Sequence, residues 1–137
     1  MKTRRPILLA EDDVVDQETV RRALKEIKVT NRLEVTSNGE EALKYLRNEA
    51  NERPCLILLD LKMPKMDGTE FLRAVKKDEK LRIFPVVVLT TSKEEQDKVE
   101  SFRLGVAGYM LKAVDYKQIV EVVKTIDLYW TLSELPE

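Results

Sequence analysis

Short apolar runs alternate along the chain with longer segments in which apolar residues recur at helical spacing. Almost continuously apolar runs occur at 7–10, 55–60, 85–90 and 108–112, and a more mixed run occurs at 33–36. Continuous runs of this kind are typical of parallel strands that helices cover on both faces. Helical patterns are predicted near 15–28, 38–50, 67–78, 92–105 and 115–130. The alternation predicts one α/β domain with an open parallel sheet wound on both faces.

The predicted helices begin with recognisable capping residues. In four places a Ser or Asp is followed three residues later by Glu or Gln, which is the spacing of a capping box. The four capping residues are Ser37, Asp67, Ser92 and Asp115. These residues therefore have a structural role that is independent of any function. Asp13 is a further candidate, because it could cap the first helix instead of contacting a metal.

Composition narrows the classes of function. With 43% hydrophobic and 36% charged residues, the 137-residue chain has the composition of one folded domain. Its 24 basic and 25 acidic residues nearly cancel, so neither nucleic acid nor membrane is an expected partner. The absence of histidine excludes histidine-dependent catalysis and histidine-ligated metals. The single cysteine, Cys55, excludes an internal disulfide and is predicted to be a buried structural residue.

The beginning of the chain carries no targeting signal in this interpretation. The sequence "MKTRRPILLAEDD" is basic, but its apolar stretch ends after four residues at a group of acids. Such a stretch is too short for a signal peptide or a membrane span. A cytoplasmic location is therefore expected.

Chemically reactive residues follow the predicted strands at the point where each strand ends. Because the carboxyl ends of parallel strands meet at one edge of the sheet, we expect these side chains to converge there. They are Glu11, Asp12 and Asp13 after the first strand, Asp60 ending the third, Thr90 ending the fourth and Lys112 ending the fifth. Crowded carboxylates repel one another unless a cation lies between them. Mg²⁺ is a hard divalent ion that binds carboxylate oxygens of this kind.

This arrangement favours phosphoryl chemistry on Asp60. A strand-end carboxylate can act as a nucleophile and form an aspartyl phosphate. A divalent ion and the ammonium of Lys112 would neutralise the charge that develops during transfer, and Thr90 would supply a hydroxyl. The structural alternative is that a strand-end acid merely caps the next helix. The coincidence of four such segments in order favours the functional interpretation.

With these residues in place, the chain resembles the receiver domains of bacterial response regulators, of the chemotaxis-regulator type. The resemblance extends from Ile7 to about Ile126 and rests on four motifs in order, "LLAEDD", "LILLDLKMPKMDG", "PVVVLTTS" and "GYMLK". It implies a flavodoxin-like fold, a doubly wound five-stranded parallel sheet with five helices. It also implies a signalling protein of a two-component phosphorelay rather than an enzyme acting on a separate substrate.

The resemblance assigns the metal site and the phosphoacceptor residue by residue. Asp60 would be phosphorylated by a sensor histidine kinase or a small phosphodonor. Asp12 would bind Mg²⁺ directly and Glu11 through water, with Asp60 and the backbone carbonyl of Lys62 as further ligands.

The same resemblance assigns the switch. Thr90 corresponds to the switch hydroxyl, Lys112 to the lysine that pairs with the phosphoryl group, and Tyr109 to the aromatic residue that moves inward. The movement would reshape the face formed by the fourth helix, fifth strand and fifth helix, and so change partner binding.

Two residues depart from the family pattern. Ala113 follows Lys112 where the family usually has a cis proline, and a non-proline cis peptide costs about 2.5–4 kcal/mol. The loop after Lys112 is therefore predicted to be trans and differently shaped. Lys62 lies two residues after the phosphoacceptor, where its side chain is hypothesised to slow hydrolysis. The alternative is a solvated surface lysine.

The end of the chain is unexpectedly apolar. After the receiver pattern, a helical extension at about 127–137 adds Leu128, Tyr129, Trp130, Leu132 and Leu135. Tyrosine and tryptophan are favoured interface anchors, so a homodimer through the fifth helix and this extension is predicted. The alternative is that the segment folds back on its own domain. This ending resembles that of stand-alone regulators associated with phytochrome histidine kinases, which makes a phytochrome a candidate partner.

Three other functions compete with this interpretation. A magnesium-dependent phosphatase of the haloacid dehalogenase type needs a second acid where this chain has Lys62. A nucleotide- or flavin-binding module needs a glycine-rich loop where this chain has "AEDD". A receiver-like binding module that works without phosphorylation remains the main alternative, although Asp12, Asp60, Thr90 and Lys112 are all present.

Overall fold

The computed structural model describes residues 4–26, 28–90 and 92–111, without the side chains of Thr90, Met110 and Leu111. Within these residues strands and helices alternate strictly, as predicted. The strands are β1 (Ile7–Ala10), β2 (Leu33–Thr36), β3 (Leu56–Asp60), β4 (Val86–Thr90) and β5 (Gly108–Leu111). The helices are α1 (Val14–Glu26), α2 (Gly39–Arg47), α3 (Gly68–Lys77) and α4 (Lys93–Ser101). The helix predicted at 115–130 and the extension at 127–137 lie outside the described residues.

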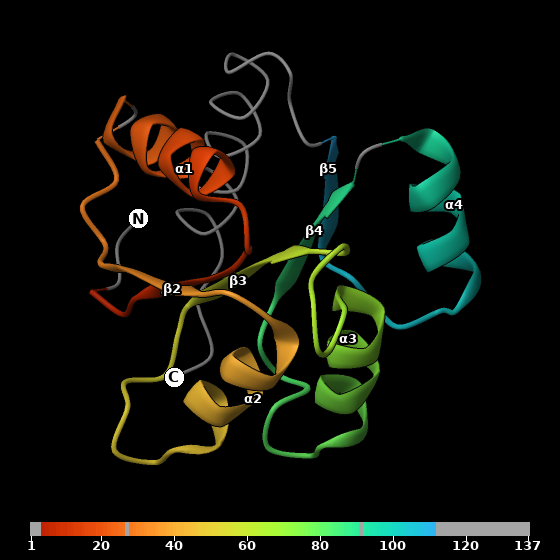
Figure 1. Cartoon of the computed structure of the whole chain (residues 1–137). Coiled ribbons are helices and arrows are strands. Elements are labelled where there is room, and N and C mark those ends of the chain that lie inside the picture. Colours follow the sequence, from red (N-terminus) through yellow and green to blue (C-terminus); the bar gives the residue numbers. More distant parts are fainter. Residues whose placement is uncertain (1–3, 27, 91, 112–137) are drawn as a thin grey trace.

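The strands form one parallel sheet in the order β2-β1-β3-β4-β5. Figure 1 shows β2 and β5 at opposite edges, with α1 on one face and α2 and α3 on the other. The winding direction reverses at β1, because the chain runs from β1 outward to β2 and then returns to β3 on the other side. Sheets of this kind bind ligands beyond the carboxyl ends of the strands at such a reversal, here between β1 and β3.

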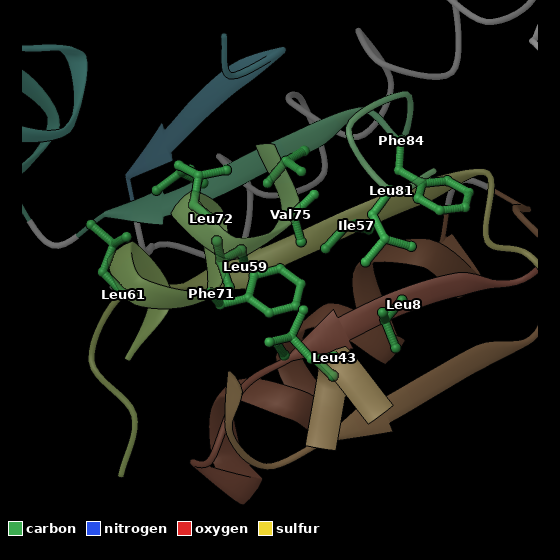
Figure 2. Packing of buried hydrophobic residues seen from close by; sticks show 14 of the residues in the cluster. Leu8, Leu43, Ile57, Leu59, Leu61, Phe71, Leu72, Val75, Leu81 and Phe84 are labelled. Carbon is green, nitrogen blue, oxygen red and sulfur yellow. The ribbon is translucent and has the colours of Figure 1, made fainter. Parts of the chain in front are cut away.

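The core has two layers because successive side chains of a strand point to opposite faces of the sheet. One layer, under α1, contains Leu9, Leu58 and Val87. The other, under α2 and α3, contains Leu8, Ile57, Leu59, Phe71 and Val88, and Figure 2 shows the Phe71 ring beside Leu59 and directed toward Leu43. The central strands β1 and β3 are buried along their whole length, which accounts for their continuous apolar sequence.

The helix boundaries follow local capping. Asp67 forms the predicted capping box with Glu70, and Ser92 accepts a hydrogen bond from the backbone N–H of Glu95. The prediction for the second helix was wrong by one residue: Asn38, not Ser37, is the cap, and its side chain accepts from the N–H of Glu41. The predicted cap at Asp115 lies outside the described residues.

Two helices are shorter than their patterns predicted. α2 ends at Arg47 because the Asn48 side chain accepts a hydrogen bond from the backbone of Ala50, which turns the chain out of the helix. α4 ends at Ser101, and Arg103 and Gly105 then adopt positive φ angles of 52° and 68°.

The described helices include none that is long and apolar enough to cross a membrane.

Candidate functional site

Two carboxylates are buried side by side where β1 and β3 end. The strands pair with Ala10 opposite Leu59, and the next residue along each chain is Glu11 and Asp60. The residue Glu11 is 0% exposed and Asp60 is 1% exposed. Burying two acids is costly unless cations or hydrogen-bond donors balance their charge. Neither acid belongs to the apolar core, so this edge of the sheet needs a cation or hydrogen-bond donors to offset their charge.

Asp12 completes an acidic cluster at the same edge. One carboxylate oxygen from each of Glu11, Asp12 and Asp60 lies within 4.8 Å of the others. Asp12 is exposed, so the cluster opens to solvent on one side. Three oxygen donors at this spacing suit a hard divalent cation, which keeps some waters while it binds one or two carboxylates. The residues present therefore fit a metal of this class.

The third acid after β1, Asp13, has a different role. Its Oδ1 accepts hydrogen bonds from the backbone N–H groups of Val15 at 2.8 Å and Asp16 at 3.1 Å. These are the otherwise unpaired donors at the beginning of α1, so Asp13 caps that helix. The Asp13 N–H in turn lies 3.3 Å from Oε2 of Glu11.

The backbone at Glu11 is held from two directions. Its N–H donates to the carbonyl of Thr36 at the end of β2, at 2.9 Å. Its carbonyl accepts from Nε2 of Gln17, which lies on α1, at 2.7 Å. The buried acid is thus positioned by a neighbouring strand and by the helix that Asp13 caps.

The loop between β3 and α3 passes very close to the phosphoacceptor candidate. The N–H of Gly68 donates to the carbonyl of Leu61 at 3.0 Å. A Cβ atom on Gly68 would lie 2.3 Å from the carbonyl oxygen of Asp60, so only glycine allows this approach. The N–H of Gly39 donates to the Met66 carbonyl at 2.9 Å, which fastens the same loop to the beginning of α2.

Lys62 lies in this loop, and its side chain reaches toward α4. Its Nζ is 4.0 Å from Oε2 of Glu95, and the lysine side chain is 73% exposed. The ammonium is thus solvated and also paired with an acid from another element.

The predicted switch residues are only partly described. Thr90 ends β4 one residue beyond Leu89, which pairs with Asp60, so its backbone is near the end of the site. Tyr109 is a half-buried residue of β5 packed against the α2–α3 layer of the core. Burial, followed by the charge of Glu100, raises the pKa of the Tyr109 hydroxyl. Lys112 and Ala113 lie outside the described residues.

Some positioning residues were not found from the sequence alone. Gly68 follows the capping residue Asp67, but its close approach to the backbone of Asp60 has no signal in the sequence pattern. The spacing of Ser92 and Glu95 predicts the beginning of a helix, but nothing in the sequence around Glu95 indicates that it pairs with Lys62. Gln17 likewise contacts Glu11 only because α1 folds back over the end of β1.

Comparisons with known proteins agree with this geometry. A family model described as the response regulator receiver domain matches residues 7–124. The response regulator Rcp1 of a Synechocystis strain is 38% identical over 128 residues, covering 90% of this chain and 87% of that protein. A probable methanogenesis regulatory protein, FilR2 of Methanothrix harundinacea, is 39% identical, covering 90% of this chain and 82% of that protein.

Solved structures show the same fold. The Mn(2+)-bound form of Rcp1 superposes with a TM-score of 0.83 at 37% identity, covering 97% of this chain and 99% of that one. The phosphorylated cyanobacterial phytochrome response regulator RcpA superposes with a TM-score of 0.83 at 39% identity and the same coverage. With the sheet order and acidic cluster described above, these matches show that the chain belongs to the family of response regulator receiver domains, the signalling proteins of two-component systems.

Proposed function

We propose that Asp60 is the phosphoacceptor of this receiver domain and that its phosphorylation depends on Mg²⁺. The observation that carries the proposal is the cluster of carboxylates from Glu11, Asp12 and Asp60, within 4.8 Å of one another at the winding reversal. Glu11, Asp12, Asp60 and the backbone carbonyl of Lys62 would hold the ion. When bound, Mg²⁺ supplies positive charge that offsets the negative charge on the transferring phosphoryl group.

The transfer is a displacement at phosphorus. A carboxylate oxygen of Asp60 forms the new P–O bond, while the bond from phosphorus to the donor breaks and the donor keeps the electron pair. For a phosphohistidine donor the broken bond is P–N, and the imidazole leaves with a proton taken from solvent. Hydrolysis reverses the modification, because water attacks the phosphorus and releases inorganic phosphate, which leaves the Asp60 carboxylate as before.

The remaining residues of the proposed machinery stabilise and report the modification. Lys112 would pair with a phosphoryl oxygen and Thr90 would donate its hydroxyl to another. Tyr109, half-buried on β5, would move inward into the space that Thr90 vacates. These movements would change the face formed by α4, β5 and the predicted fifth helix, as a shift between two packings.

The proposed phosphodonor is a sensor histidine kinase, with a phytochrome as the specific candidate. The similarity to RcpA, a phytochrome response regulator, supports this choice at 39% identity. The protein would act in the cytoplasm without binding nucleic acid or membrane. It would catalyse only its own phosphoryl transfer and slow dephosphorylation.

Intact-mass spectrometry after incubation with acetyl phosphate and Mg²⁺ tests the proposal. We expect one added phosphoryl group, which is absent when a chelator is present or when Asp60→Asn is used. Asp67→Asn is the matched control, because it removes the same charge from the loop that follows β3 and should keep the adduct. An adduct that persists in Asp60→Asn contradicts the proposal. No adduct, and no binding of beryllofluoride, would favour the phosphorylation-independent binding module.

A homodimer formed through the predicted fifth helix and the extension at 127–137 is also part of the proposal. It rests on the apolar composition of that segment, which lies outside the described residues. Light-scattering mass measured over a range of concentrations should rise toward twice the monomer mass, and Trp130→Ala should lower the association. A mass that stays monomeric at every concentration would rule the dimer out.

A further inference from the structure

Within the described part of the chain, α4 buries little of its surface against the rest of the domain. Val99 is the one buried residue among Lys93–Ser101, whereas α3 buries Gly68, Phe71, Leu72 and Val75. Beyond Val99, the ring of Phe102 at the end of α4 lies under the guanidinium of Arg73 from α3, 4.4 Å from its centroid. Figure 1 shows α4 at the β5 side of the sheet, away from α2. Elements with so little buried surface open more easily than the core.

The beginning of α4 has an electrostatic attachment of its own. Glu95 lies in the first turn, where its N–H donates to the side chain of Ser92 at 3.2 Å. Its carboxylate lies 4.0 Å from Nζ of Lys62, and the glutamate side chain is only 17% exposed. The pair therefore connects the first turn of α4 to the loop that leaves Asp60.

We propose that Lys62 is a shared cation that pairs with Glu95 in the unmodified protein and with the phosphoryl group once Asp60 is phosphorylated. The proposal rests on Asp60 being the phosphoacceptor. Lys62 is two residues from Asp60, a backbone separation of at most about 7 Å, and its stem has four flexible carbons. A phosphoryl group carries about −1.5 to −2 charges, so it attracts the ammonium more strongly than a single carboxylate does.

The exchange has two consequences. Glu95 loses its pairing with Lys62 at the moment when negative charge is added nearby, so the first turn of α4 becomes easier to open. The phosphoryl group gains a cation that neutralises it and occupies space near the path of attacking water. Competition for one ammonium thereby links the lifetime of the modification to the stability of α4.

The first test is a comparison of phosphate lifetimes by intact-mass spectrometry after removal of acetyl phosphate. Glu95→Gln frees Lys62, so its phosphorylated form should persist about two- to fivefold longer than wild type, the range expected from a solvent-accessible ion pair. Glu94→Gln is the matched control, because it removes the same charge from an exposed residue of the same turn, and its lifetime should equal that of wild type. In a Lys62→Gln background, Glu95→Gln should no longer change the lifetime.

The second test is hydrogen exchange of the peptide covering the first turn of α4, with and without Mg²⁺ and beryllofluoride. In wild type and Glu94→Gln we expect faster exchange when the phosphoryl mimic is bound. Lys62→Gln and Glu95→Gln should begin with faster exchange and respond less. Wild-type responses in both variants, together with equal phosphate lifetimes, would overturn the shared-cation proposal. If neither wild type nor any variant gains a phosphoryl group, the assignment of Asp60 as the phosphoacceptor fails instead. The mass measurement therefore distinguishes failure of that assignment from failure of the shared-cation proposal.

Discussion

At the scale of single residues, adjacent acids of the same type perform different tasks. Asp12 and Asp13 are consecutive in the sequence, yet Asp12 faces Glu11 and Asp60 while Asp13 binds the first N–H groups of α1. Composition and spacing left both roles open for Asp13. The structure separates them because the chain turns from strand to helix between the two side chains.

Because Asp12 and Asp13 have different contacts, substitutions of the two residues should affect stabilisation by Mg²⁺ differently. For wild type, Mg²⁺ at ten times its dissociation constant should raise the free energy of unfolding by about 1.4 kcal/mol, since only the folded protein assembles the site. Asp12→Asn should lose most of this increase. Asp13→Asn removes the same charge but retains a good cap, so its Mg²⁺ response should match wild type. Urea unfolding with Mg²⁺ or chelator measures the difference, and equal responses of the two variants would argue against the metal site.

Cys55 provides a second prediction, which concerns pH. Burial raises the pKa of the Cys55 thiol from 9.0 to about 11, and the residue is 3% exposed, as the sequence predicted for a structural cysteine. Folding therefore favours the protonated thiol. The resulting contribution to stability is fully present below about pH 9 and is lost as the pH rises toward 11.

The measurement compares wild type with Cys55→Ala by urea unfolding at several alkaline pH values. The difference in free energy of unfolding between the two should shrink as the pH rises through this window, because only wild type has the thiol to deprotonate. The comparison cancels the titration of the lysines and tyrosines that both proteins share. A difference that stays constant with pH would show that the folded thiol titrates normally.

At the scale of elements, the loop from β3 to α3 brings the beginning of α3 very close to the backbone of Asp60. Gly68→Ala would place a Cβ 2.3 Å from the Asp60 carbonyl oxygen and 2.7 Å from the Cα of Leu61. Both are backbone atoms, so the beginning of α3 must shift rather than a side chain. We expect a loss of about 1–3 kcal/mol in unfolding free energy, as for other overpacked sites, with slower phosphorylation of Asp60.

Gly108→Ala is the matched control for this substitution. Among the described residues, the nearest atom to its added Cβ would be Cγ2 of Val87 at 3.8 Å, which is an ordinary contact. We therefore expect little change in stability and a normal rate of phosphorylation, measured in the same urea and mass experiments. If Gly68→Ala behaved like Gly108→Ala, the close approach of α3 to Asp60 would not matter for the site.

At the scale of the whole molecule, the two core layers hold the sheet that presents the site. Phe71 is 0% exposed and belongs to the layer between the sheet and α2 and α3 (Figure 2). Phe71→Ala should lower the free energy of unfolding by about 3–5 kcal/mol, through lost burial and the cavity left behind. Ile83→Ala, at a residue 50% exposed, should cost far less. Denaturant unfolding compares them, and similar costs would mean that Phe71 is not a core residue.

The fold could be predicted largely because its signals are local. Strand runs such as "LILL" are continuously apolar because both faces of β3 are covered. Capping pairs such as Asp67 and Glu70 mark helix beginnings within four residues. Boundaries were less predictable. Asn38, not Ser37, caps α2, because the sequence does not distinguish two adjacent capping residues. α4 ends at Ser101, short of its predicted end, and the positive φ of Arg103 that follows has no signal in the sequence.

The sequence by itself predicted which residues form the candidate site and the order in which the strands bring them there. It did so because alternating apolar and helical periods dictate a parallel sheet, and such a sheet brings strand ends together. Only the tertiary structure decided which acids share one site, how closely Gly68 approaches Asp60, and that Lys62 meets Glu95. The acidic cluster and the contact between Lys62 and Glu95 join residues far apart in the chain, and the approach of Gly68 to Asp60 depends on how the loop folds. All three distances depend on strand register and helix packing rather than on any local pattern.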